Sequence, residues 1–449
     1  MDEAKALETL RRMNRWWADG RVPKELSRDF KRKEFGKAME LLGLQRMLVI
    51  IGARRVGKTV LMHQIIERLL ESKKRENIMY VQLDHPNLRN IGLEELIGVF
   101  KRHLRPEGEL YVFLDEVQYV DDWSLWLKSL YDRKEPIKFV LSGSAASTLK
   151  KDSESLLGRS AEIELYPFSF DEFARFRGFR PSLGQGIEGL PTGGLREYLE
   201  YKEWAEPLLN EYIRRGGFPE TFEIENADVS EELLREDITS KAIYRDIVSV
   251  YGIKNPELLE GVFTYLCFNS SRILNKDNAS GDLGIDKVTL SSYLGYLRSA
   301  FLAYEAKNYS RNIKRTLGTM SRFYVCDPGL INSITSYGES LFLDQDKIGM
   351  LMETIVFNRC FIHARQKGGK AFYWRDKQKN EVDVVVKLGK RTIPIEVKYR
   401  SRIGKRDVKS LEKFMREFKA DRGVVVTKDL FEERGKILYI PAWLFLLAL

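Results

Sequence analysis

Short apolar runs alternate with longer amphipathic stretches over the first 165 residues of the chain. The apolar runs occupy residues 46–52, 78–84, 110–116, 137–142 and 161–165. Residues 57–72 and 92–104 lie between them and repeat apolar positions with the period of a helix. Strands that alternate with helices are typical of a parallel sheet covered on both faces. The pattern therefore predicts a doubly wound, mostly parallel α/β sheet.

The pattern changes in the rest of the chain. After a glycine- and proline-rich stretch at 178–194, residues 195–265 are helical in rhythm. Residues 257–326 then read as helix, polar loop, helix and two strands, and from about residue 345 a second α/β unit follows. Residues 1–40 are helical and mixed in charge, and we expect them to form an arm that packs on the sheet through a pair of tryptophans.

Composition limits the classes of protein. The 449 residues are 43% hydrophobic and 31% charged, which is enough apolar material for folded cores. A net charge of +9 over this length permits nucleic-acid binding without establishing it. The three cysteines and four histidines are scattered, so we expect neither a zinc site nor a disulfide framework. No secretory signal or membrane-length apolar run is visible, so we expect a cytoplasmic protein without a membrane partner.

Residues 52–59, GARRVGKT, have the spacing of a phosphate-binding loop (P-loop) between an apolar strand and a helix. The two glycines allow backbone N–H groups to wrap phosphate oxygens, and the helix N-terminus adds a favourable dipole. In this hypothesis Lys58 reaches the β and γ phosphates of ATP and Thr59 is a Mg²⁺ ligand. A plain glycine turn is the alternative. The predicted nucleotide-binding residues are Gly52, Arg54, Arg55, Val56, Gly57, Lys58, Thr59, Val60 and Asp115.

The apolar run at 110–116 ends in two acids, Asp115 and Glu116. At the carboxyl end of a strand, Asp115 can hold Mg²⁺ directly or through water, and Glu116 can polarise the attacking water. Adjacent acids in this position favour hydrolysis over transfer to an acceptor. A solvated strand end is the alternative.

Longer segments resemble those of AAA-type archaeal and bacterial ATPases that carry a C-terminal domain of unknown function related to restriction nucleases. The segments are GARRVGKT, LDEVQYVDDW, FVLSGSAAS, LLGRSAEIELYPFSFDEF, RRGGFPE at 214–220 and FYVCDPGL at 323–330. The resemblance implies a polar sensor at the end of the fourth core strand, where Ser142 and Ser144 are candidates and Ser144 is preferred. It also implies self-association in which Arg159 reaches the γ-phosphate of a neighbouring subunit. A plain surface arginine is the alternative.

The middle of the chain has the order of a winged helix, which the resemblance also implies. A helix at 286–300 precedes two strands whose connection carries Arg311, Lys314 and Arg315. A recognition helix of this kind can enter the major groove of DNA while the cations meet phosphates. Winged helices also dock proteins, so a domain-packing module with a solvated basic loop is the alternative.

The last α/β unit has the acids and the lysine of a metal-dependent nuclease. Glu353 lies in a helix and Asp383 near the start of a strand. Glu396 and Lys398 are two residues apart on the next strand and therefore share a face. The three carboxylates can share Mg²⁺ while Lys398 orients or deprotonates water. The arrangement resembles the restriction-endonuclease-like PD-(D/E)xK fold, with Val382 in place of the motif proline. An ion-paired Glu396–Lys398 face in an inactive domain is the alternative.

These inferences combine into five predicted segments and two candidate functions. The segments are an N-terminal helical arm (1–40), a P-loop ATPase core (41–177), a helical lid or linker (178–256), a winged-helix module (257–340) and a restriction-endonuclease-like domain (341–449). The first candidate is an ATP-hydrolysing AAA-type ATPase that binds DNA and cleaves it with Mg²⁺, branched DNA included. The second is a nucleotide-gated regulator or scaffold that binds DNA or protein and does not cut.

Overall fold

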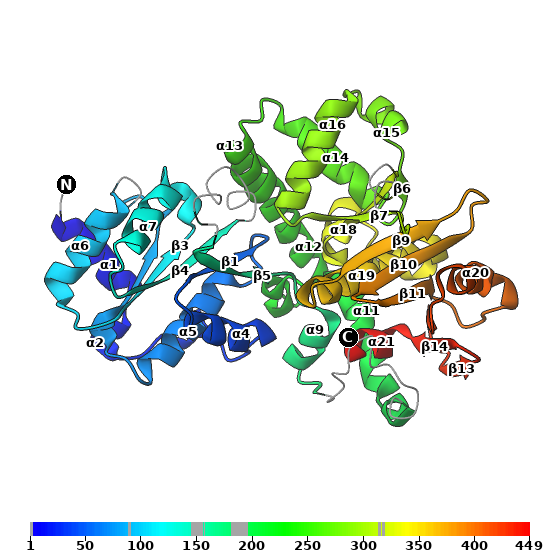
Figure 1. The fold of residues 1–449 in the computed structure, drawn as a ribbon, viewed down its shortest axis with the longest axis horizontal. Helices are drawn as coiled ribbons and strands as arrows, with labels where there is room; N and C mark the ends of the chain where they lie inside the picture. The colour runs from blue at the N-terminus through cyan, green and yellow to red at the C-terminus, as the bar shows by residue number, and fades with distance from the viewer. Residues whose placement is uncertain are drawn as a thin grey trace. The chain divides into compact units, whose positions relative to one another are not determined.

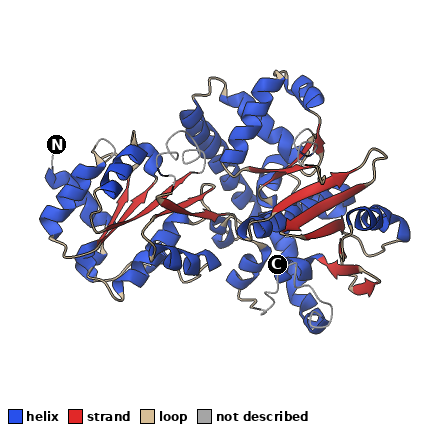
Figure 2. Ribbon diagram, in the orientation of Figure 1, coloured by secondary structure: helices blue, strands red, loops and turns tan. Residues whose placement is uncertain are grey.

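The structure is a computed structural model that describes residues 3–88, 91–144, 156, 158–180, 196–312, 316 and 319–449. The chain divides into two compact units, Met1–Tyr166 and Pro167–Leu449. Both units mix helices and strands, as Figure 1 and Figure 2 show. No helix in the described ranges combines the length and the apolarity that crossing a bilayer requires.

The first unit is built on a five-stranded sheet with the order β2-β3-β4-β1-β5. Every strand pair in it is parallel. Helices α4 and α5 lie on one face of the sheet, and α6 and α7 lie on the other (Figure 1). The elements are α1 Glu3–Met13, α2 Trp16–Asp19, α3 Lys24–Ser27, α4 Lys33–Leu42, β1 Met47–Gly52, α5 Lys58–Leu70, β2 Ile78–Gln82, α6 Leu93–Leu104, β3 Leu110–Asp115, α7 Trp123–Asp132, β4 Ile137–Ser144 and β5 Ser160–Leu165. The predicted parallel sheet is confirmed, and the predicted strands differ from the observed ones only at their ends.

The N-terminal segment packs on β2, which is an edge strand of this sheet. The indole N–H groups of Trp16 and Trp17 both donate to the carbonyl oxygen of Ile78, at 3.2 and 2.8 Å. The side-chain amide of Asn14 donates to the carbonyl of Tyr80 at 2.8 Å and accepts from its N–H at 2.6 Å. Asn14 thus pairs with β2 as a neighbouring strand would, which protects the edge from another chain.

The second unit contains two sheets. One has six strands in the order β13-β14-β12-β11-β10-β9, and the other has three antiparallel strands in the order β6-β8-β7. Helices α19 and α20 pack against the larger sheet, and α14 and α16 pack against the smaller one. The elements are α9 Phe170–Phe176, α11 Lys202–Arg215, α12 Ala227–Glu236, a π-helix η7 Asp237–Ile247, α13 Val248–Tyr251, α14 Pro256–Phe268, β6 Ile273–Leu274, α15 Lys276–Leu283, α16 Lys287–Ser299, β7 Ala303–Lys307, β8 Ser321–Val325, α18 Pro328–Thr335, α19 Gln345–Gln366, β9 Lys370–Arg375, β10 Glu381–Leu388, β11 Arg391–Lys398, α20 Lys409–Phe418, β12 Gly423–Thr427, β13 Glu432–Arg434, β14 Ile437–Pro441 and α21 Ala442–Ala448.

Hydrogen bonds join the two sheets of the second unit. The side chain of Asn308, just after β7, donates to the carbonyl of Arg375 at 2.8 Å and accepts from its N–H at 2.9 Å. The backbone N–H of Tyr309 donates to the carbonyl of Tyr373 at 2.7 Å. The predicted segments 257–340 and 341–449 therefore lie in one compact unit.

Two segments of the resemblance, RRGGFPE and FYVCDPGL, meet around the buried carboxylate of Asp327. This carboxylate accepts the N–H of Gly217 at 2.6 Å and the N–H of Gly329 at 2.9 Å. A Cβ on Gly217 would lie 2.1 Å from the carbonyl oxygen of Phe168, and one on Gly216 would lie 1.9 Å from Asp327 Oδ1. Only glycine fits so close an approach of backbone to backbone and of backbone to carboxylate. Both segments therefore have a structural role in this joint.

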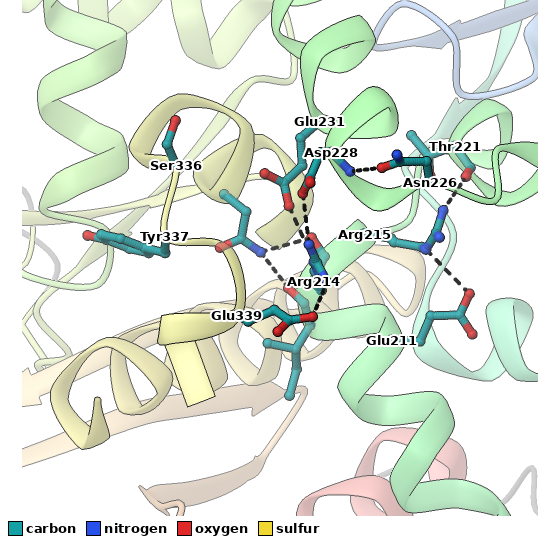
Figure 3. Close-up of polar contacts among 12 residues, drawn as sticks. Glu211, Arg214, Arg215, Thr221, Asn226, Asp228, Glu231, Ser336, Tyr337 and Glu339 are labelled. Carbon is teal, nitrogen blue, oxygen red and sulfur yellow. Dashed lines mark hydrogen bonds and ion pairs between the residues drawn. The ribbon is translucent and has the colours of Figure 1, made fainter. Parts of the chain in front are cut away.

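Consecutive arginines at the end of α11 hold the segments around the joint (Figure 3). Arg214 lies among three carboxylates, with Asp228 Oδ1 at 2.9 Å, Glu339 Oε1 at 3.5 Å and Glu231 Oε1 at 3.6 Å. Arg215 donates to three backbone carbonyls of the loop that follows, and it also contacts Glu211 Oε1 at 3.6 Å. One arginine thus links α12 and the turn before α19 to α11, and the other orders the loop between α11 and α12.

We expect the substitution Gly217→Ala to destabilise the second unit by about 1–3 kcal/mol, because the added methyl group overpacks against the Phe168 backbone. Gly295→Ala is the matched control, since a Cβ there meets no atom within 4 Å and the residue lies inside α16. It should be neutral or stabilise by up to about 1 kcal/mol through helix propensity. Calorimetry of the full chain measures both. Equal midpoints for the two variants would contradict the role of the joint.

Candidate functional site

The predicted P-loop residues form the loop between β1 and α5. Gly52 on β1 pairs with Leu165 on the adjacent strand β5. A Cβ on Gly52 would lie 2.1 Å from the carbonyl oxygen of Leu165. Arg55 and Gly57 both have left-handed backbones, with φ of 62° and 97°. Left-handed residues in such a turn point backbone N–H groups into a common concavity, which is a site for anions. Sequence reasoning explained both glycines but could not foresee the conformation of Arg55.

The side chain of Lys58 lies inside this loop. The residue is buried, and its ammonium donates to the carbonyl oxygens of Gly52 at 3.1 Å and of Ala53 at 2.9 Å. Two neutral carbonyls compensate a buried positive charge poorly, whereas a phosphate oxygen compensates it well. The position of Lys58 therefore fits an anionic ligand in the loop.

The carboxylate of Asp115, at the end of β3, accepts hydrogen bonds from three side-chain hydroxyls of the first unit. Its Oδ2 accepts the hydroxyls of Thr59 and Tyr80, both at 2.7 Å. Its Oδ1 accepts the hydroxyl of Ser142. Burial and the neighbouring Asp115 carboxylate raise the pKa of Tyr80 well above its ordinary value, so this hydroxyl remains protonated and donates. The carboxylate and Thr59 are together, as a Mg²⁺ site beside the loop requires.

Glu116, the predicted water-polarising residue, has a left-handed backbone with φ of 57°. Its N–H donates to the hydroxyl oxygen of Ser142 at 3.2 Å, and its carboxylate accepts the side-chain amide of Gln118. A left-handed glutamate carries backbone strain, and such strain gathers at functional sites. Ser142 therefore contacts both predicted acids. The side chain of Ser144, the preferred sensor candidate, lies outside the described residues.

The other predicted residues of the first unit lie in the loop and at the start of α5, except Arg159, whose carbonyl accepts the N–H of Met47 at the opposite end of β1. Arg54, Arg55 and Val60 are partly exposed, whereas Val56 is buried. Arg159 makes two contacts with Asp132, Nε to Oδ1 at 3.0 Å and Nη2 to Oδ2 at 3.3 Å. Sequence reasoning missed Arg32, which donates to the carbonyls of Val56 at 3.3 Å and of Tyr166 at 2.8 Å. Arg32 thus ties the N-terminal segment to the loop.

The second unit brings Glu353, Asp383, Glu396 and Lys398 together. Lys398 Nζ lies 2.5 Å from Glu396 Oε1 and 3.8 Å from Asp383 Oδ2. Asp383 also accepts the N–H of Val397 at 2.8 Å. Burial and the Asp383 charge raise the pKa of the Glu353 carboxyl to about 8, and the same causes raise the pKa of Glu396. Glu396 Oε2 is buried and has no hydrogen-bond partner.

The predicted metal ligands Glu353, Asp383 and Glu396 lie next to cationic side chains in this structure. The described ranges contain no group of three His, Cys, Asp or Glu side chains in an arrangement that could hold a metal ion. Two cations contact the predicted ligands. Lys398 pairs with Glu396, and Arg322, which sequence reasoning missed, pairs with Glu353. A charged residue inside the apolar strand RFYVC was the signal, because a buried arginine must have partners.

The predicted DNA-binding cations lie in the connection between β7 and β8. Arg311 donates through Nη2 to the carbonyl of Glu417 at 2.9 Å, and its guanidinium lies 5.5 Å from the ring centre of Phe418. Arg311 is therefore engaged with α20. Lys314 and Arg315 lie outside the described residues.

We expect Tyr80→Phe to destabilise the first unit by about 1.5–3 kcal/mol, because it removes a buried hydroxyl that donates to a carboxylate. Tyr131→Phe is the matched control, since the hydroxyl of Tyr131 donates to the Gln45 carbonyl at an exposed position. Thermal unfolding of the two variants separates these effects. A Tyr80→Phe protein as stable as the control would show that this hydroxyl does not hold Asp115.

Three families match parts of the chain. Residues 44–174 match the family described as an AAA domain. Residues 206–341 and 348–445 match two domains of unknown function, DUF8612 and DUF4143.

Similar proteins of known sequence are uncharacterized. One from Methanocaldococcus jannaschii is 28% identical over 387 residues, which is 84% of this chain and 80% of that protein. One from Haemophilus influenzae is 28% identical over 295 residues, which is 63% of this chain and 67% of that protein. A second protein of M. jannaschii is 25% identical over 415 residues, covering 90% and 85%.

Two solved structures show a limited likeness. The Aeropyrum pernix ORC1 protein in complex with DNA has a TM-score of 0.30 at 13% identity, over 69% of this chain and 93% of that one. AMPPCP-bound DnaA from Aquifex aeolicus has a TM-score of 0.27 at 14% identity, over 62% and 92%. Residues 44–174 thus match an AAA domain and carry the loop geometry described above, and the residues after them match two domains of unknown function.

Proposed function

We propose that the first unit binds ATP with Mg²⁺ and hydrolyses it. The observation that carries this proposal is the contact between Thr59 and Asp115 beside a loop that encloses the ammonium of Lys58. The match of residues 44–174 to an AAA domain supports it. A strand-end carboxylate, a loop lysine and a helix-start hydroxyl are the parts that P-loop hydrolases use.

Different residues of the first unit have different roles in this proposal. Lys58 and the backbone N–H groups of the loop hold the phosphates, while Thr59 and Asp115 hold Mg²⁺, which neutralises charge on the phosphate oxygens. Glu116 polarises the attacking water, and its strained backbone fixes where its carboxylate lies. Ser142 holds Asp115 and Glu116 in register, so we propose it as the polar sensor that the sequence placed at Ser142 or Ser144.

Self-association through Arg159 stays a proposal. The pairing of Arg159 with Asp132 supports a positioned guanidinium, and sedimentation of the full chain with and without ATP tests assembly.

We further propose that the second unit binds DNA and does not cleave it. Its order α14, β6, α15, α16, β7, β8 is that of a winged helix, with α16 in the place of the recognition helix. Exposed Lys287 and Val288 begin α16. The order α19, β9, β10, β11, α20, β12 supports a restriction-endonuclease-like domain. Because its acids are paired with cations, the non-cutting alternative is the one that the geometry favours.

For ATP, we expect Lys58→Ala to abolish tight nucleotide binding. Glu116→Gln should keep binding and lower turnover by about 10²-fold or more, because only the water-polarising group is removed. Glu107→Gln is the matched control, since Glu107 is an exposed glutamate just before β3. Nucleotide titration and phosphate release measure the two steps. Equal loss of binding in Lys58→Ala and Glu116→Gln would show that Glu116 has another role.

For DNA, we expect the double variant Lys314→Ala/Arg315→Ala to weaken binding to all duplex sequences. The dependence of log affinity on log salt should flatten by up to about 0.9 for each DNA phosphate that the variant no longer neutralises. Arg311→Ala should change this slope less, because α20 already engages that guanidinium. Lys436→Ala, an exposed cation between β13 and β14, is the control. Fluorescence anisotropy over a salt series measures the slope, and an unchanged slope in the double variant would favour protein docking.

A further inference from the structure

A buried arginine lies in the carboxylate cluster of the second unit. Arg322 is on β8, the central strand of the small sheet, and its side chain is 5% exposed. Its Nη1 lies 2.6 Å from Glu353 Oε1 and 3.9 Å from Asp383 Oδ1, and its Nη2 pairs with Glu381. One guanidinium therefore connects β8 to helix α19 and to strand β10, which carry two of the three predicted metal ligands.

Nη1 contacts Glu353 and lies close to Asp383, which are two of the three predicted metal ligands. A guanidinium nitrogen between two carboxylates supplies positive charge and donors there, and it repels a divalent cation at the same place. The acidic side chains of the cluster also have cationic partners without a metal. Four carboxylates face three cationic side chains, namely Glu353, Glu381, Asp383 and Glu396 against Arg322, Arg375 and Lys398.

The surroundings of Arg322 hold it in place. Its guanidinium lies 5.0 Å from the ring centre of Tyr373, on β9, and the Tyr373 hydroxyl donates to the carbonyl of Met320 at 2.8 Å. Next to this contact, Asn308 and Tyr309 form the backbone seam between the two sheets. Movement of Arg322 away from the acids would therefore break several contacts together.

We propose that Arg322 is a built-in cation that takes the place of a metal ion, so that the carboxylate cluster fastens the small sheet to the large one instead of supporting metal-dependent cleavage. This inference rests on the part of the proposed function that gives the second unit a non-cutting role. It adds the reason: the winged-helix candidate and the nuclease-like sheet share one ionic joint. The cluster then serves to hold the DNA-binding module in a fixed relation to α19 and β10.

The test is a calorimetric titration of the nucleotide-free full chain with Mn²⁺, compared with the same titration of Asp383→Asn. In wild-type protein we expect no Mn²⁺ site that depends on Asp383. The Asp383→Asn protein should therefore give the same titration as wild type. Arg322→Gln should gain such a site, with apparent affinity at least tenfold tighter than any residual wild-type binding, because Glu353 and Asp383 are freed from the competing cation. The double variant Arg322→Gln/Asp383→Asn should lose it again.

Arg375→Gln is the matched control. Arg375 contacts the outer oxygen of Glu381 at 3.4 Å and is partly exposed, so its removal takes the same charge from the edge of the cluster and should not create a Mn²⁺ site. A wild-type Mn²⁺ site that Asp383→Asn abolishes would overturn the proposal, as would wild-type cleavage of linear, forked or four-way DNA that needs Mg²⁺ or Mn²⁺ and Asp383.

Two further comparisons cover a variant that does not fold and separate this proposal from DNA binding. If Arg322→Gln does not fold, the comparison of wild type with Asp383→Asn settles the matter alone. DNA affinity measured on the same proteins separates the two proposals, because a wild type without DNA affinity refutes the binding role and leaves the Mn²⁺ result standing.

Discussion

The buried carboxylate of Asp115 is the contact on which the first unit depends. Three hydroxyls converge on it: Thr59 from α5, Tyr80 from β2 and Ser142 from β4. Because each comes from a different element, one charged group fixes the P-loop helix against neighbouring strands of the sheet. The same group is the proposed partner of Mg²⁺, so one residue would serve both the fold and the nucleotide site. Glu116 follows directly and has a left-handed backbone.

The second unit also depends on buried carboxylates. Here cationic side chains of the protein pair with them, whereas Mg²⁺ is the proposed partner of Asp115. Arg322 and Lys398 lie on the carboxylates of α19, β10 and β11, and the glycine-rich joint around Asp327 holds α11 close to α18. Buried ion pairs of this kind cost desolvation energy and give definite geometry when every partner is in place. Their presence at a seam between two sheets is consistent with a module whose parts must keep a fixed relation.

Local patterns in the sequence predicted much of the first unit, because strand and helix periodicity and the GARRVGKT spacing are properties of neighbouring residues. The contacts of Asn14, Arg32 and Tyr80 with distant elements were not predictable in this way, since no short spacing encodes them. In the second unit the residues Glu353, Asp383, Glu396 and Lys398 were correctly brought together. Their contact with Arg322 was not foreseen, because Arg322 lies on a strand that the pattern assigned to another module.

The central claim is that the loop of the first unit holds the phosphates of ATP. The most direct measurement is a crystal structure of the full chain with Mg²⁺ and a non-hydrolysable ATP analogue. The account predicts that Lys58 Nζ leaves the carbonyl oxygens of Gly52 and Ala53 and contacts the phosphates, with Mg²⁺ held at Thr59 beside Asp115. An analogue bound elsewhere at saturating concentration, with Lys58 still on those two carbonyls, would contradict it.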